Sequence, residues 1–255
     1  MKSRLILFII SSFVVFSTLV ATAQSETSPY KIHTALDIPT ISAASVGSLS
    51  TRWLQRQIKP LSGIEISQLT TATIPTIDLS AHSKWSPRAD KISNLGTYAA
   101  MMTPGLLFFS PSIHRKDWGT IILLSAETFA LTDFAVQLTK SQVLRPRPFL
   151  YNTNIVVPEE LLMDKMHRFS MMSGSTAYAA AMSFTGASLF SDYHPNSKLK
   201  PYIWVAAVII PTAIGFLRYQ SGHHYPTDIL VGYVVGTSIG IAIPYIHRKA
   251  KIWFQ

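Results

Sequence analysis

The 255-residue sequence is long enough for one domain with a sizeable core, and its 48% hydrophobic and 14% charged residues favour a membrane protein over a soluble one. The formal net charge is +9, but the basic residues are scattered in small groups without interleaved aromatic side chains, so nucleic acid is not expected as a partner. The absence of cysteine excludes disulfides, thiolate metal sites and a cysteine nucleophile.

The N-terminus has the pattern of an export signal. Lys2 and Arg4 precede an apolar run over 5–20, and small residues follow it. Residues 1–23 are therefore predicted to be a signal peptide that is cleaved before Gln24. The apolar run is also about long enough to remain as an uncleaved membrane anchor, because roughly 17 to 25 residues span a bilayer.

The next region, residues 24–93, is polar and rich in Ser and Thr. Pro60, Pro75 and Pro87 interrupt it, and it has no sustained helical or strand period. Short amphipathic pieces around 64–79 and a loosely ordered cover are both compatible with this composition. We expect an exported N-terminal region.

From residue 95 onward, apolar stretches alternate with short charged links. The stretches are residues 95–113, 118–138, about 176–191, 201–217 and 229–246. Helices that cross a bilayer have this appearance, because their backbone groups must bond internally. Residues 94–255 are therefore predicted to form an all-α, membrane-embedded bundle of about five to six helices. A soluble, wholly buried bundle stays open, because the second stretch carries Glu127 and Asp133.

The charged links between the stretches predict how the chain crosses the membrane. Three of them are basic: residues 114–116, the pair Lys198 and Lys200, and the tail from His247 to Lys251. Cytoplasmic loops are enriched in Lys and Arg. If these links face the cytoplasm, residues 24–93, 139–175 and 218–228 lie at the periplasmic face of a bacterial-type inner membrane.

Three polar segments between the stretches contain residues suited to chemistry, and the first holds two cations. Lys140 and Arg147 lie seven residues apart at the exit of an apolar stretch, and Pro148 follows Arg147. Alone, such a pair is typical of a basic helix end that favours the helix dipole or anionic lipid head groups.

The second segment is Ser173-Gly174-Ser175, immediately before an Ala-rich apolar stretch that begins near Thr176. A helix start offers free backbone N–H groups, and glycine permits close approach, so this segment suits a phosphate. An ordinary serine N-cap is the alternative.

The third segment begins at Arg218 and contains the adjacent residues His223 and His224, followed by Asp228. Pro226 suits the first position of the final helix, which places the carboxylate within its first turn. A carboxylate that accepts the proton from one ring nitrogen leaves the other free to attack. Metal binding is the alternative, although adjacent histidines seldom face one ion.

Together, these segments resemble the signature blocks of the type 2 phosphatidic acid phosphatase superfamily, which includes lipid phosphatases, bacterial acid phosphatases and vanadium haloperoxidases. The first block, Lys, six residues, Arg-Pro, is met by Lys140 and Arg147. The third block, Arg, five residues, His, three residues, Asp, is met by Arg218, His224 and Asp228.

The resemblance covers roughly residues 95–246, and its middle block departs from the family pattern. The family usually has Pro-Ser-Gly-His, whereas this chain has Met172-Ser173-Gly174-Ser175. The histidine replaced by Ser175 is the general acid of the family, so this departure bears on the rate of any reaction.

The resemblance implies a role for each matched residue. Lys140, Arg147 and Arg218 would neutralise the phosphoryl oxygens, with the Gly174 N–H and the Ser173 hydroxyl completing the cradle. No metal and no cofactor is implied.

The resemblance also makes His224 the nucleophile, oriented by Asp228, so that a phospho-histidine forms. Because Ser175 is a poor acid, the proton could come from His223 or His167, or the substrate could be a diphosphate whose phosphate leaves without one. The implied function is metal-independent phosphate release from a lipid phosphate or polyprenyl diphosphate. The alternatives are a lipid-phosphate-binding protein with an impaired site, and a soluble exported acid phosphatase.

Overall fold

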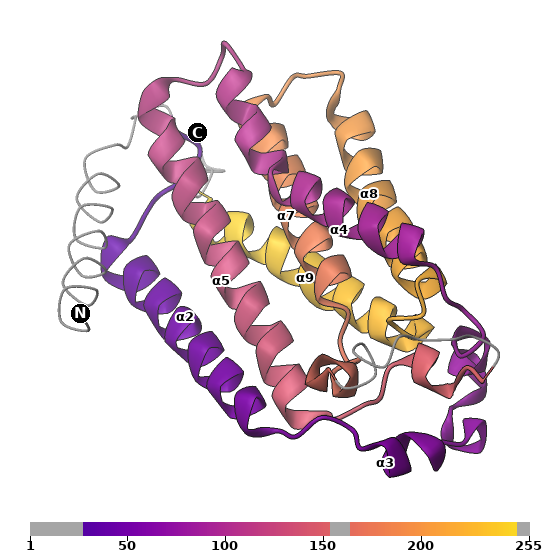
Figure 1. Ribbon diagram of the computed structural model, residues 1–255. Helices are drawn as coiled ribbons and strands as arrows, with labels where there is room; N and C mark the ends of the chain where they lie inside the picture. Colours follow the sequence, from indigo (N-terminus) through magenta and orange to yellow (C-terminus); the bar gives the residue numbers. More distant parts are fainter. Residues whose placement is uncertain (1–27, 154–163, 249–255) are drawn as a thin grey trace.

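The computed structural model describes residues 28–153 and 164–248, and these form a helical bundle (Figure 1). The α-helices are α2 (Thr34–Gln57), α3 (Gly63–Ser67), α4 (Pro87–Met101), α5 (Trp118–Gln142), α7 (Gly174–Tyr193), α8 (Lys200–Gln220) and α9 (Pro226–His247). Each predicted apolar stretch contributes a helix, so the predicted all-α fold is confirmed. The predicted signal peptide lies outside the described residues.

Helix α7 forms the centre of the bundle, with α4, α5, α8 and α9 packed around it. Its closest neighbour is α9, which presents Gly232, Gly236 and Gly240 at every fourth position. A Cβ atom at Gly236 would lie only 2.2 Å from the carbonyl oxygen of Ala177. The two backbones are therefore in direct contact, which small residues permit between membrane helices.

Among the described residues, three segments are long and apolar enough to cross a membrane: Arg115–Gln142, Lys200–Gln220 and Pro226–His247. Large apolar side chains point outward from α8 and α9, among them Val205, Ile209, Phe216, Leu230, Val234 and Ile246. An exposed apolar surface of this kind faces lipid. Helix α7 is shielded from it, and its many Ala, Ser and Gly residues serve packing inside the bundle.

The N-terminal region contains a long helix that its sequence pattern did not predict. Helix α2 packs along α5, where Ser48 Oγ and Arg52 Nη2 both donate to the carboxylate of Asp133, the latter over 2.6 Å. Its buried side chains include Asp37, Ser48, Thr51 and Gln55. The buried face of α2 is thus polar, and a search for an apolar period does not detect it. Asp133 is satisfied by this neighbouring helix.

Helix α2 also joins the two ends of the bundle (Figure 1). At its start, Lys31 N donates to His247 O over 2.8 Å, and Tyr30 forms an antiparallel bridge with Arg248. The start of α5 and the link between α7 and α8 lie at this same end. Part of residues 24–93 therefore lies at the end of the bundle away from the other polar segments, and the export of this region stays a prediction.

Candidate active site

The first predicted segment brings two buried cations to the end of α5. Lys140 lies in the last turn, and its Nζ donates to Phe169 O over 3.4 Å. The Arg147 backbone N donates to His167 O over 2.9 Å, while its side-chain Nε makes no hydrogen bond to the described residues. Burial, with the nearby Arg218 cation, lowers the pKa of Arg147 to about 10. A buried cation short of acceptors is suited to an anion.

The second segment begins α7, and Ser173 is its N-cap. The Ser173 hydroxyl accepts from Thr176 N over 3.4 Å, and the Ser173 backbone N donates to Asp228 O over 3.0 Å. Gly174 is the first helical residue. The ordinary N-cap interpretation therefore holds for the Ser173 side chain, and a part in holding phosphate is a further proposal.

Arg218 projects from α8 toward the polar face of α4. Its Nη1 donates to Asp90 Oδ1 over 2.5 Å, to Ser93 Oγ over 3.2 Å and to Asn94 Oδ1 over 3.1 Å. Its Nε makes no hydrogen bond among the described residues. Helix α4 thus fixes one edge of the guanidinium, an arrangement that the spacing of the motif does not reveal.

His224 is buried, and its ring is held by a backbone carbonyl. Its Nδ1 lies 2.7 Å from Ser170 O, whereas Asp228 Oδ2 is 3.7 Å away, beyond a hydrogen bond. A carbonyl only accepts, so Nδ1 carries the hydrogen and Nε2 keeps its lone pair. Burial is the main cause that lowers the pKa of His224 to about 3, and Arg218 and Arg147 add to it. The predicted direct pairing with Asp228 is thus replaced by one through Ser170.

Asp228 holds that arrangement from behind, fully buried. It accepts hydrogen bonds from Tyr225 N over 2.9 Å, from Ser170 Oγ over 2.5 Å and from Arg145 Nη1 over 2.6 Å. Arg145 also donates to Asp78 Oδ2 over 2.7 Å, and its guanidinium lies 3.8 Å from the centre of the Tyr225 ring. Sequence reasoning missed this network, although Arg145 stands only two residues before the matched Arg147.

The N-terminal region supplies one wall of the site. Asp78, in the short helical segment Thr76–Ala81, accepts from Thr227 N over 3.0 Å and from Thr227 Oγ1 over 2.6 Å. Farther along, Lys84 approaches Gly222, whose φ of +74° and lack of a side chain are both required there. Residues 76–84 therefore close over the link between α8 and α9.

The two histidines predicted as alternative acids lie on either side of Phe149. The ring centre of His167 is 4.8 Å from that of Phe149, and the ring centre of His223 is 5.6 Å from it. His223 also stacks on Trp85, and its Nδ1 is 3.7 Å from Asp90 Oδ1. Burial, followed by the nearby Arg147 and Arg218 cations, strongly lowers the pKa of His223. The structure thus brings both rings close to the cationic part of the site.

Ser175 follows Gly174 in the first turn of α7, and it lines the same cavity as Asn94, the residue that accepts a hydrogen bond from Arg218. The cavity has a volume of about 230 Å³ and is also lined by Arg52, Tyr98, Phe129 and Tyr178. This cavity is bounded by α2, α4, α5 and α7. The residue that replaces the family histidine therefore borders an open space between helices.

One family model and one solved structure are similar to this chain. The family model of the PAP2 superfamily, the type 2 phosphatidic acid phosphatases, matches residues 118–252. A solved structure of a transmembrane PAP2 type phosphatidylglycerolphosphate phosphatase from Bacillus subtilis is similar with a TM-score of 0.48 and 20% identity, covering 96% of this chain and 98% of that chain. No curated protein matches the sequence. Because the family match spans more than half of the chain, this protein belongs to the PAP2 superfamily.

Proposed function

We propose that the protein is a metal-independent phosphatase that releases phosphate from a lipid phosphate or a polyprenyl diphosphate through a phospho-histidine at His224. Superfamily membership supports phosphatase chemistry. The observation that carries the proposal is the His224 ring, whose Nδ1 donates to Ser170 O over 2.7 Å, so that its Nε2 keeps the lone pair. Arg147 and Arg218 add to burial in lowering the pKa of this ring, which supports a cationic surrounding for the nucleophile.

The reaction proceeds in two displacements at phosphorus. In the first, the Nε2 lone pair of His224 forms the N–P bond while the P–O bond to the leaving group breaks, and the leaving oxygen keeps the electron pair. Lys140, Arg147 and Arg218 neutralise the phosphoryl oxygens, which is the main requirement of phosphoryl transfer. In the second, water attacks phosphorus, the N–P bond breaks, and phosphate leaves.

The leaving group determines whether a protein acid is needed. A diphosphate expels a phosphate monoester, which leaves without a proton, so Ser175 is tolerated with a polyprenyl diphosphate. An alcohol leaving group requires a proton. A general acid that supplies this proton typically raises the reaction rate by about 10² to 10⁴. Of the two histidines, His167 is the better candidate to supply it, because the lowered pKa of His223 keeps that ring neutral.

We place the protein in a bacterial-type inner membrane with the site at the periplasmic face. The apolar exteriors of α8 and α9 support the membrane location. The basic links at the end opposite His224 support the orientation, because such links stay in the cytoplasm.

The proposal is tested by phosphate release from the purified protein in detergent with a chelator present. A polyprenyl diphosphate and a phosphatidic acid are compared, and His224→Ala is set against His114→Ala, an exposed histidine outside the site. We expect release that His224→Ala abolishes and His114→Ala leaves intact. Unchanged release by His224→Ala would overturn the proposal.

A second function, lipid-phosphate binding without turnover, is favoured by one observation, the serine at position 175. In that case the cradle would bind a lipid phosphate, and neither substrate would release phosphate. Restoring the family histidine at this position distinguishes the two functions, as described in the Discussion.

A further inference from the structure

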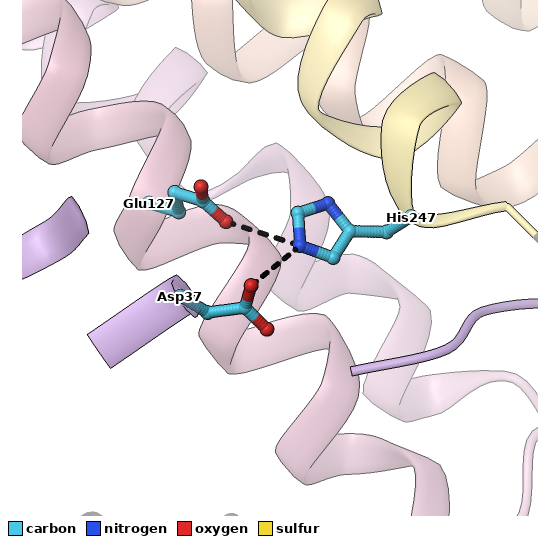
Figure 2. A group of neighbouring side chains, drawn as sticks. All are labelled: Asp37, Glu127 and His247. Atoms are coloured by element: carbon cyan, nitrogen blue, oxygen red, sulfur yellow. Dashed lines mark hydrogen bonds and ion pairs between the residues drawn. The ribbon is translucent and has the colours of Figure 1, made fainter. Parts of the chain in front are cut away.

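A second cluster of ionisable side chains lies at the end of the bundle opposite His224. Figure 2 shows Asp37 from α2, Glu127 from α5 and His247 from α9 pointing toward one another. Their exposed fractions are only 4%, 5% and 6%, and one ligand atom from each lies within 4.8 Å of the other two. Three elements far apart in the sequence thus bring potential metal ligands together.

The spacing of these atoms matches a metal site. His247 Nε2 lies 3.1 Å from Asp37 Oδ1 and 3.4 Å from Glu127 Oε2. Zinc binds nitrogen and oxygen ligands at about 2.1 Å in tetrahedral geometry, which separates neighbouring ligand atoms by about 3.4 Å. An ion can therefore be accommodated with little movement of the side chains.

The hydrogen bonds around the cluster orient its ligands. His247 Nδ1 lies 2.9 Å from Ile243 O, so Nδ1 donates there and the Nε2 lone pair points at the two carboxylates. Asp37 Oδ2 accepts from His33 N over 2.8 Å, which leaves Oδ1 for the cluster. Metal-binding histidines and carboxylates are held by such partners, which fix the tautomer and the orientation of the ring.

The charges of the cluster favour a bound cation. If His247 is neutral, its Nε2 lone pair faces two buried carboxylates. If His247 is protonated, its single Nε2–H neutralises the charge of only one of them. Glu127 Oε2 is buried and accepts no hydrogen bond from the described residues. A divalent cation neutralises both carboxylates, whereas a buried unpaired charge is strongly unfavourable.

We propose that Asp37, Glu127 and His247 form a structural site for a divalent transition metal of the zinc class. Imidazole with carboxylates suits zinc, and the imidazole disfavours calcium and magnesium. The site lies away from His224 and is separate from the proposed phosphatase reaction. Its ion would clamp α2 and α9 onto α5.

The test uses the full chain without a histidine tag, purified in detergent and stripped with a chelator. Zn²⁺ is then titrated, with bound metal per chain measured by mass spectrometry and thermal unfolding recorded. We expect about one ion per chain and a higher Tm. Glu127→Gln and Asp37→Asn are expected to weaken binding by at least about tenfold, since even changes to outer-shell partners weaken metal sites by 10- to 100-fold.

Asp133→Asn is the matched control, because it alters a buried acid of α5 outside the cluster. We expect it to keep the stoichiometry of the wild type. The proposal is overturned if the wild type binds no more Zn²⁺ than Glu127→Gln, or if bound Zn²⁺ leaves Tm unchanged. Glu127→Gln is nearly isosteric, and its elution as a single gel-filtration peak in detergent, as for the wild type, reports that it has folded.

Discussion

The carbonyl oxygen of Ser170 lies 2.7 Å from Nδ1 of His224, while the hydroxyl of the same serine donates to Asp228. One residue therefore holds the imidazole with its backbone and the carboxylate with its side chain. Asp228 acts on the ring by fixing Ser170 and the start of α9. This arrangement makes the protonation state of His224 depend mainly on burial.

His224 is expected to remain neutral through the range in which an ordinary histidine, with a pKa near 6.5, gains a proton. Its pKa of about 3 predicts no change of its ring ¹⁵N shifts between pH 8 and 5. His224→Ala identifies the signals. As the pH falls below about 6.5, His224 gains a proton in the unfolded chain but not in the folded one. The free energy of unfolding is therefore unaffected by His224 above pH 6.5 and decreases as the pH falls from there toward 3. A titration of these signals near pH 6.5 contradicts the assignment.

Ser175→His is expected to restore a general acid. Phosphate release from phosphatidic acid, which expels an alcohol, should rise by about 10² to 10⁴. Release from a polyprenyl diphosphate should change little, because its leaving group needs no proton. The ratio of kcat/KM for the two substrates measures the effect, and Ser175→Asn controls for size. If both substrates are inert in the wild type and cleaved by Ser175→His, the native protein is the binding protein described above.

Asp78→Ala is expected to destabilise the site from the N-terminal region. Asp78 is 1% exposed and pairs with Arg145, which also binds Asp228. Arg145 keeps Asp228, but Thr227 loses its acceptor, and an unsatisfied buried donor costs about 1–3 kcal/mol, so Tm in detergent and phosphate release should both fall. The matched control is Glu65→Ala, which removes the partner of Arg168 from an exposed pair and should leave both unchanged. Equal effects of the two changes would exclude a special role for the Asp78 network.

The orientation is testable because the chain contains no cysteine, so that single cysteines can be introduced. Ser83→Cys lies at the end with the site, and Lys116→Cys lies at the other end, both at exposed positions. With a periplasmic site, an impermeant maleimide labels the first in intact spheroplasts and the second only after permeabilisation. The reverse pattern would place the site in the cytoplasm.

The same labelling decides where the N-terminus lies. Residues 28–33 lie at the end opposite the site, whereas a signal peptide cut before Gln24 would leave them outside the membrane. If α2 crosses the bilayer beside α5, Lys31→Cys is labelled together with Lys116→Cys. Labelling together with Ser83→Cys would instead indicate that α2 lies outside the bilayer.

Gly236→Ala is expected to separate α7 from α9, because the added Cβ would lie 2.2 Å from Ala177 O. Overpacking of this kind typically costs 1–3 kcal/mol. Gly63→Ala is the control, since its Cβ would meet nothing within 4 Å. We expect a lower Tm and slower phosphate release in the first variant only, measured in the same detergent. A normal Tm for Gly236→Ala would show that the contact between the two helices can relax.

The sequence was sufficient to predict the apolar helices and the segments of the site. Apolar length indicates α5, α8 and α9, and the spacing from Arg218 to Asp228 indicates a turn followed by a helix. The start of α4 at Pro87 was missed, although Ser86 caps it and accepts from Ala89 N over 3.2 Å. That helix begins in polar sequence, and only its N-cap marks it.

The sequence could not reveal which charges pair across the fold. Helix α2 buries polar groups against Asp133, and Arg145 joins Asp78 to Asp228 over long sequence separations. Residues that pair across long sequence separations leave no periodic pattern in the local sequence. The Ser170 contact of His224 was missed for the same reason, because a backbone carbonyl can be supplied by any residue type.

The pairing of Lys31 with His247 has a consequence for the order in which the protein matures. Residues near the N-terminus are synthesised first, but their partners in α9 are synthesised last. Asp78 likewise meets Thr227 only after α9 has formed. A growing chain therefore cannot complete its site before α9 has emerged from the ribosome, and loss of α9 by truncation would remove the partners of the N-terminal segment along with the nucleophile's support.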